Sequence, residues 1–256
     1  MSHHIIEVKD LKHTYPDGTT ALRDISFRIT HGESVGIIGA NGAGKSTLLL
    51  HLNGYLTPSA GEIRIGDFPL TTSTLPEIRR TVGMVFQDPD DQLFMPTVFD
   101  DVAFGPLNLG LSSDEVELRV LKALEQVDAA HLVNKPPYHL SGGEKKRVAI
   151  ATVLSMSPAI LVMDEPTSGL DPFARRRLMA LLRDFSHTKI FTSHDLDMVM
   201  DLCERTIVLH EGEIRADGPT REIFQNEDLL VECHLEKPLS LQGCPICGRQ
   251  SDRLNS

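Results

Sequence analysis

Leu140-Ser141-Gly142-Gly143-Glu144 is the stretch of this sequence that decides its fold, together with the two segments that flank it. The upstream segment is Gly39-Ala40-Asn41-Gly42-Ala43-Gly44-Lys45-Ser46-Thr47, and the downstream one is Ala159-Ile160-Leu161-Val162-Met163-Asp164-Glu165-Pro166. The middle stretch predicts a helix that starts with a serine and two glycines. Its hydroxyl and unpaired N–H groups would form an anion site that has no phosphate of its own nearby. Two copies related by a twofold axis would satisfy each other, with Ser141, Gly142 and Gly143 of one chain facing the glycine-rich segment of the other.

The upstream segment fits the phosphate-binding pattern G-x-x-x-x-G-K-[ST]. It follows an apolar run over residues 34–38, typical of a strand buried in a parallel sheet, and it precedes a predicted helix over residues 46–52. Glycines let N–H groups approach phosphate oxygens, Lys45 would neutralise phosphate charge, and Ser46 would bind Mg²⁺. This placement disfavours the alternative of a tight turn in an unrelated α/β protein. We therefore expect ATP to bind along the whole run: Gly39, Ala40, Asn41, Gly42, Ala43, Gly44, Lys45, Ser46 and Thr47.

The downstream segment predicts a buried strand that ends in two carboxylates. Open α/β sheets bind ligands at the carboxyl ends of their strands, where Asp164 and Glu165 would emerge. Asp164 suits the coordination shell of Mg²⁺, and Glu165 can polarise an attacking water. The alternative, a pair that only caps the next turn, is weak beside the glycine-rich segment.

In this order the segments resemble the ATP-binding-cassette (ABC) ATPases, over about residues 5–222. The resemblance implies an α/β fold with a P-loop NTPase (RecA-like) core, an N-terminal antiparallel β subdomain and a helical signature subdomain over about residues 96–158. We expect an ATPase domain at residues 1–222 and a C-terminal tail at residues 223–256. Residues 112–115 have the form of a capping box, which introduces an apolar helical stripe of Val116, Val120, Leu121, Leu124 and Val127.

The resemblance also implies roles for residues outside these segments. Gln87 would bind Mg²⁺, sense the γ-phosphate and face a membrane partner, and His194 would contact the γ-phosphate as a switch histidine. Asp171, in Ser168-Gly169-Leu170-Asp171, would lie in the loop that crosses to the opposite subunit. Tyr15 would stack on adenine, although a plain core tyrosine accounts for it equally well. A lone histidine after a strand is more often structural, but the position of His194 after the carboxylate pair favours the switch role.

Gln87-Asp88-Pro89-Asp90-Asp91-Gln92-Leu93-Phe94 resembles the form of this segment in energy-coupling-factor importers, particularly their cobalt/nickel branch. A solvated turn is the alternative for the paired acids. The resemblance implies an ATP-driven motor at the cytoplasmic face of the cell membrane. Its partners would be a second ATPase chain, an integral membrane coupling subunit and a substrate-binding membrane protein. A homodimer is favoured over a heterodimer with a paralogous ATPase, and the solute stays open between metal ions and vitamins.

Composition and charge narrow the alternatives. The 256 residues are 41% hydrophobic and 24% charged, and the net charge of -11 argues against a nucleic-acid partner. A DNA-repair or translation ABC ATPase is disfavoured, because the sequence has neither a long coiled-coil insertion nor a second cassette. The N-terminus lacks signal-peptide features and no apolar run could span a bilayer, so we expect a cytosolic chain whose membrane contact goes through a partner. Lys145-Lys146-Arg147 is expected on the solvated face of its helix.

The C-terminal segment suggests a metal site. Cys244-Pro245-Ile246-Cys247-Gly248 has the spacing of a zinc knuckle, and closed sites normally need four ligands. Cys233 and His234 could complete the set within one chain, or two knuckles could pair across a dimer. The alternative is a disordered tail with a redox-sensitive cysteine pair. Zn²⁺ or another transition metal in the tail is therefore a hypothesis.

Overall fold

A computed structural model describes residues 4–242 of the chain. Among these residues, no helix combines the length and apolar character needed to cross a lipid bilayer. The smaller of two sheets is antiparallel, with the strand order β2-β1-β4-β5. Its strands are β1 (His4–Thr14), β2 (Thr20–Thr30), β4 (Ala60–Ile65) and β5 (Phe68–Pro69). The predicted N-terminal antiparallel subdomain is therefore confirmed.

The larger sheet has six strands in the order β10-β9-β3-β8-β7-β6. Its strands are β3 (Ser34–Ile38), β6 (Val82–Val85), β7 (Ile160–Asp164), β8 (Thr188–Thr192), β9 (Arg205–His210) and β10 (Glu213–Pro219). All neighbours pair in parallel except β10, which forms an antiparallel hairpin with β9. Every residue of β3 and β7 is buried, as expected for central strands covered on both faces.

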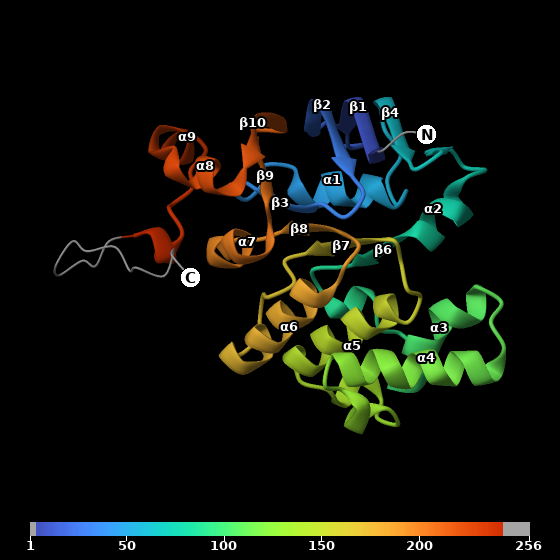
Figure 1. Ribbon diagram of the computed structural model, residues 1–256. Coiled ribbons are helices and arrows are strands. Elements are labelled where there is room, and N and C mark those ends of the chain that lie inside the picture. Colours follow the sequence, from blue (N-terminus) through green and yellow to red (C-terminus); the bar gives the residue numbers. More distant parts are fainter. Residues whose placement is uncertain (1–3, 243–256) are drawn as a thin grey trace.

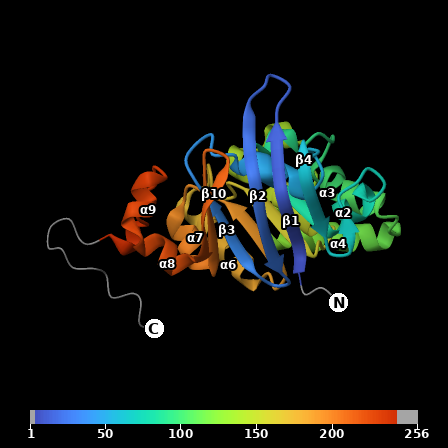
Figure 2. The same ribbon diagram turned by 90° about the horizontal axis from the view of Figure 1, so that it is seen from above.

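Helices cover the larger sheet on the face away from the small sheet. In Figure 1, α3, α4, α5 and α6 gather below the strands, while β1, β2 and β4 lie above them, and Figure 2 shows those strands from above. The helices are α1 (Lys45–Leu52), α2 (Leu75–Thr81), α3 (Val98–Asn108), α4 (Ser113–Gln126), α5 (Gly142–Leu154), α6 (Pro172–Asp184), α7 (Leu196–Leu202), α8 (Thr220–Gln225) and α9 (Glu227–Glu232). Short 3₁₀ turns are η1 (Pro89–Asp91), η2 (Ala130–Leu132), η3 (Pro137–His139) and η4 (Leu239–Leu241).

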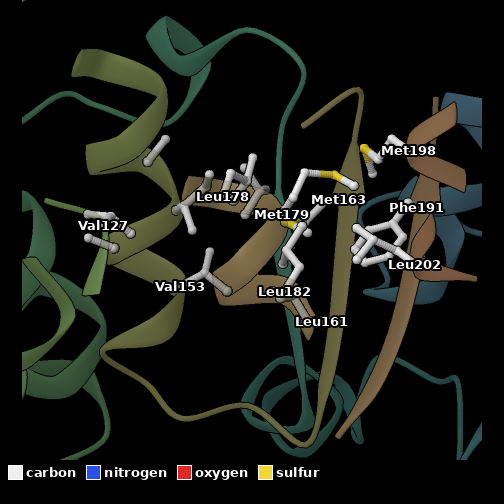
Figure 3. Packing of buried hydrophobic residues seen from close by; sticks show 14 of the residues in the cluster. Val127, Val153, Leu161, Met163, Leu178, Met179, Leu182, Phe191, Met198 and Leu202 are labelled. Atoms are coloured by element: carbon white, nitrogen blue, oxygen red, sulfur yellow. The ribbon is translucent and has the colours of Figure 1, made fainter. Parts of the chain in front are cut away.

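Strand β7 contributes to two hydrophobic cores, one on each face of the larger sheet. Leu161 and Met163 belong to the core shared with the helices, whereas Ile160 and Val162 belong to the core beneath the small sheet. Figure 3 shows Leu161 and Met163 packed near Leu182 of α6. Full burial of one such side chain contributes roughly 1.5–3 kcal/mol. The strand is therefore fixed from both sides.

Helix α4 begins with the predicted capping box. The Ser112 hydroxyl accepts a hydrogen bond from the Glu115 N–H, and the Glu115 carboxylate accepts one from the Ser112 N–H. Leu121, which was placed on the apolar stripe, is instead 40% exposed. It follows the buried Val120 by one position, about 100° around the helix axis, and so faces outward. The buried residues of this helix are Val116, Val120, Ala123 and Leu124.

The chain continues to pack against the larger sheet beyond residue 222. That expected boundary lies inside α8, and α9 follows directly. Phe224, Leu230 and Cys233 are buried in the core that contains the helices. The sequence left these two helices in the tail because each is too short to show a clear apolar period.

Candidate functional site

One cleft brings together predicted residues from distant parts of the chain. Its volume is about 350 Å³, within the range of small-ligand sites. It lies at the carboxyl ends of β3, β7 and β8, where α/β sheets bind ligands. The predicted residues that line it are Tyr15, Asn41, Gly42, Gly44, Lys45, Ser46, Thr47, Gln87, Asp164, Glu165 and His194.

The glycine-rich loop joins β3 to α1 and requires glycine at specific points. Gly44 has φ of 101°, and a Cβ there would lie 2.6 Å from the carbonyl oxygen of Ala21. Gly42 also adopts a positive φ, of 80°. Ala43 is buried behind the loop. The backbone N–H groups at the start of α1 are thereby available to an anion.

Lys45 supplies a buried positive charge at the loop. Its side chain is 7% exposed, and the ammonium donates hydrogen bonds to the carbonyls of Gly39 (2.8 Å) and Ala40 (3.1 Å). Burial lowers the pKa of Lys45, while the nearby carboxylates of Glu165 and Asp164 oppose that shift. A cation at a helix N-terminus, in a chain of net charge -11, fits a polyphosphate such as that of ATP.

Two carboxylates stand at the end of β7 and are held by β8. The Thr192 hydroxyl donates a hydrogen bond to Asp164, and the Glu165 N–H donates to the same hydroxyl at 3.2 Å. The backbone of Glu165 has φ of 47°, which is uncommon outside glycine. Its Oε2 accepts a hydrogen bond from the His194 N–H at 3.0 Å. Its Oε1 is buried, 3.5 Å from His194 Nε2, and has no hydrogen-bond partner among residues 4–242.

Oxygen donors for a divalent cation meet beside these carboxylates. Ser46, Gln87 and Asp164 line both the main cleft and a cavity that adjoins it. Hydroxyl, amide and carboxylate oxygens are the ligands that Mg²⁺ prefers, so this donor set fits that ion. When bound, Mg²⁺ would neutralise phosphate charge next to Lys45.

Tyr15 lines the cleft and is half-buried. Its hydroxyl is hydrogen-bonded to Thr47 Oγ1 at 2.9 Å, which ties β1 to α1. Its ring lies edge-on to that of His13, with centroids 4.7 Å apart. Tyr15 therefore contributes both to the lining of the cleft and to the contact between β1 and α1.

The signature stretch, residues 140–144, lies outside this cleft, at the N-terminus of α5. The Ser141 hydroxyl donates to the Glu144 carboxylate at 2.8 Å and accepts from the Glu144 N–H at 3.4 Å, which forms a second capping box. The Ser141 N–H also donates to the Glu144 carboxylate at 2.8 Å, and this bond, with that of the Ser141 hydroxyl, lowers the pKa of Glu144. Ser141 is exposed, as predicted, but its hydroxyl also bonds within the chain; the Ser-x-x-Glu pattern that predicts the start of α4 indicates this bond too.

The fold of this chain does not require Gly142 and Gly143. A Cβ at Gly142 would meet no atom of the described residues within 4 Å, and one at Gly143 only Leu170 Cδ2 at 3.9 Å; neither φ is positive. Helix α4 starts with the same capping box but carries Ser113 and Asp114 at the equivalent positions. Glycine within a helix costs about 0.5–1 kcal/mol relative to alanine. The glycine pair therefore indicates close approach by something outside this chain.

Asp171 lies next to the signature stretch rather than in the cleft. Its carboxylate caps α6 by accepting from the N–H groups of Phe173 (2.8 Å) and Ala174 (3.0 Å). Leu170 is the residue nearest to Gly143, and Asp171 itself is exposed. The structure thus separates the predicted residues into a cleft and an exposed second surface.

Sequence analysis missed two links around the cleft. Thr192 is not among the predicted site residues, yet its hydroxyl donates a hydrogen bond to the Asp164 carboxylate and accepts one from the Glu165 N–H. Arg175 of α6 forms a two-bond ion pair with Asp195, at 2.6 and 2.9 Å, directly after His194. Neither link has a local sequence signal, because each joins elements that meet only in the folded chain.

The prediction that Lys146 faces solvent is wrong. Its side chain is 2% exposed, and the ammonium donates to the carbonyls of Gln87 (2.8 Å) and Phe86 (3.2 Å). The neighbouring Lys145 and Arg147 do lie nearer the surface. The segment after β6 folds over α5 and covers Lys146, which the sequence does not reveal.

The hypothesis of a tail metal site gains no support from the described residues. Cys244 and Cys247 lie outside them, and residues 4–242 contain no cluster of metal-ligating side chains. Cys233 is 0% exposed within an apolar core, and burial raises the pKa of its thiol. That environment disfavours the thiolate that metal binding needs. His234, next to it, packs its ring 5.6 Å from that of His210.

Comparison with known families agrees with this geometry. The sequence model of the ABC transporter family matches residues 22–168. The chain belongs to the ABC transporter ATP-binding family. It is 77% identical to a Geobacter sulfurreducens protein described as "Putative ABC transporter ATP-binding protein", over 97% of this chain and 100% of that one. It is 49% identical to the energy-coupling factor transporter ATP-binding protein EcfA of Methanocaldococcus jannaschii, over 92% of this chain and 86% of that one.

Solved structures show the same fold. The cbiO1 protein of Clostridium perfringens, described as part of the ABC transporter complex cbiONQ, superposes with a TM-score of 0.77 at 41% identity, covering 90% of this chain and 94% of that one. The ATP-binding cassette MJ0796, in a dimeric post-hydrolysis state with ADP and phosphate, has a TM-score of 0.77 at 31% identity, covering 84% and 99%. This ABC protein is therefore an ATPase that uses ATP and Mg²⁺, and a motor subunit of a transporter.

Proposed function

We propose that the chain is the motor of an energy-coupling-factor importer of the cobalt/nickel type, acting at the cytoplasmic face of the cell membrane. One observation carries the proposal: an apolar groove adjoins the segment 87–94, and the same segment reaches the nucleotide cleft through Gln87. The EcfA relatives and the cbiO1 structure support it. The segment would thus connect nucleotide state to a docked partner.

The groove fits a helix of a membrane coupling subunit. It has a volume of about 610 Å³, and aromatic side chains stand exposed along it. Phe94 is 65% exposed and Phe104 43%, with ring centroids 5.2 Å apart in an edge-to-face arrangement. Exposed apolar patches of this kind mark interaction surfaces. We take this groove as the docking surface, and expect a substrate-binding membrane protein to complete the importer.

Within the cleft, the roles follow from the contacts. Glu165 orients and deprotonates the attacking water through Oε1, because that buried oxygen has no hydrogen-bond partner in the described chain. His194 contacts the γ-phosphate, and Tyr15 stacks on adenine. Gln87, with Ser46 and Asp164, binds Mg²⁺ beside the glycine-rich loop. Only interactions that strengthen as the phosphoryl group is transferred raise the rate.

Hydrolysis needs a second ATPase chain. Ser141, Gly142 and Gly143 of one chain would face the glycine-rich loop of the other, and Asp171 would cross to the opposite subunit. The exposed start of α5, with open space at Gly142 and Gly143, supports this arrangement, in which a twofold axis would bring the two surfaces together. A homodimer is favoured, since one chain carries both halves of the site, and a heterodimer with a paralogous ATPase uses the same contacts.

The alternative solute is a vitamin, carried by the same motor with a different membrane protein. Uptake assays with the complete complex in lipid vesicles decide between them. Accumulation of Co²⁺ or Ni²⁺ on addition of ATP supports the cobalt/nickel assignment. ATP-driven vitamin uptake without metal uptake contradicts the cobalt/nickel assignment and supports the vitamin alternative.

Substitution in the segment 87–94 should uncouple transport from ATP hydrolysis. Asp90 and Asp91 both belong to the segment 87–94, but Asp90 also forms an ion pair with Lys145 at 2.6 Å. Asp91→Asn is therefore the cleaner variant, with Asp90→Asn,Asp91→Asn as the stronger one. We expect vesicle uptake to fall about tenfold, about 1.4 kcal/mol of lost coupling, while the ATPase rate of the isolated motor stays within about twofold. Loss of both activities together would instead indicate a folding role for these residues.

A further inference from the structure

The segment 86–92, which follows β6, is hydrogen-bonded to one face of helix α5. Gln92 Oε1 accepts a hydrogen bond from the Phe86 N–H at 3.1 Å, which closes the segment on itself. Gln92 Nε2 donates to the carbonyl of Ala149 at 2.8 Å and to Thr152 Oγ1 at 2.7 Å, both on α5. Because residues three or four apart lie on one face of a helix, these contacts form a continuous strip with that of Lys146. The segment and α5 therefore form one unit.

Lys146 is the charged member of this strip. Its buried ammonium bonds only to carbonyl oxygens, of Phe86 and Gln87, and none of the ion pairs among residues 4–242 includes it. Burial lowers the pKa of Lys146, and the carboxylates of Asp164 and Glu165 act against that shift. At a contact that only stabilised the fold, burying a neutral side chain would cost less free energy than burying a charged one. The ammonium instead holds the carbonyl of Gln87, a residue that lines the nucleotide cleft, which suggests a role in the site.

We propose that Lys146 is a positioning residue that couples the two nucleotide sites of the dimer. The inference rests on the proposed function, in which the N-terminus of α5 faces the partner chain's ATP and Gln87 faces the chain's own Mg²⁺. Lys146 follows Gly142 by about one helical turn, near 6 Å. It holds the backbone of Gln87, so movement of α5 toward the partner's nucleotide sets where Gln87 stands in this chain's cleft. Binding at one site thereby prepares the other.

The test compares Lys146→Met with the wild-type chain in steady-state ATPase assays over a range of ATP concentrations. We expect kcat to fall roughly 10- to 100-fold, the scale expected when a reacting group is displaced by about 1 Å. The Hill coefficient should fall toward one, while binding of a fluorescent ATP analogue to the monomer stays within about twofold. Lys122→Met, the same change at an exposed lysine of α4, is the matched control and should leave all values unchanged.

Lys146→Arg provides the rescue arm, because it retains the charge and donors to both carbonyls, and should recover most of the cooperativity. It also keeps the test valid if the methionine variant fails to fold, as judged by circular dichroism. A folded Lys146→Met with wild-type kcat and Hill coefficient overturns the inference, as does a Lys146→Arg that folds but behaves like methionine. Failure of the proposed function is distinguishable, because the wild-type chain would then hydrolyse ATP without forming a dimer.

Discussion

Glu165→Gln is expected to retain ATP binding, lose most turnover and accumulate as an ATP-bound dimer. The Oε1 of Glu165 is buried without a partner among the described residues, so it is available to take a proton from water. An amide cannot accept that proton, and loss of such a base typically lowers the rate about 10²- to 10⁴-fold. The amide oxygen can still accept the hydrogen bond from the His194 N–H, which preserves the local structure. Steady-state ATPase assays and size-exclusion chromatography with ATP and Mg²⁺ measure both effects.

Lys45→Ala provides the contrast. It removes the ammonium that the loop carbonyls hold, so it should weaken nucleotide binding itself and prevent the ATP-dependent dimer from forming. The two variants therefore separate binding from chemistry. A Glu165→Gln protein that keeps near-normal ATPase activity would reject the role assigned to Glu165.

Gly143→Ala is expected to abolish ATP-driven dimerisation and lower the ATPase rate at least about tenfold while the chain remains as stable as before. Outside its own helical turn, the nearest atom of residues 4–242 to the added Cβ is Leu170 Cδ2 at 3.9 Å, so the methyl group is accommodated without strain. Alanine should even stabilise the start of α5, by up to about 1 kcal/mol. The loss of activity would arise only where a partner's nucleotide approaches the helix. Thermal unfolding and ATPase assays on the same preparation provide the measurement.

The second capping-box helix of the chain supplies the control. Asp114 occupies the position in α4 that Gly143 occupies in α5, so Asp114→Ala places an alanine at the same point of a capped helix, away from the second surface. It should leave ATPase activity unaltered. Equal effects of the two substitutions, or a Gly143→Ala chain that dimerises normally, would contradict the shared-site arrangement.

The sequence was sufficient for most of the core fold because its signals are local. The apolar run before the glycine-rich loop predicted β3, the capping box and apolar period predicted α4, and the serine followed by two glycines predicted the start of α5. Short helices with little apolar periodicity were not predicted; these include α2, α8 and α9. The cleft was predictable for the same reason, since strand ends and a glycine pattern place its residues together.

The features that escaped prediction depend on tertiary contacts. Lys146 sits in a run of basic residues, and only the fold shows that one of them is covered by the segment after β6. The sequence predicts that Leu121 belongs to the apolar stripe of α4, but its position around the helix axis leaves it exposed. Cys233 looked like a ligand beside a histidine and is instead a core residue. In each case the sequence identifies the residue type but not the side chains and backbone that surround it in the folded chain.

The double-sided burial of β7 also has a consequence for local unfolding. Proteins open in cooperative units, and the least stable units open first. An opening that frees the helical layer still leaves Ile160 and Val162 anchored in the opposite core. The strand therefore belongs to the last unit to lose its structure. Asp164 and Glu165 keep their backbone positions through fluctuations that detach the surrounding helices, so the chain can recover a working site without refolding it.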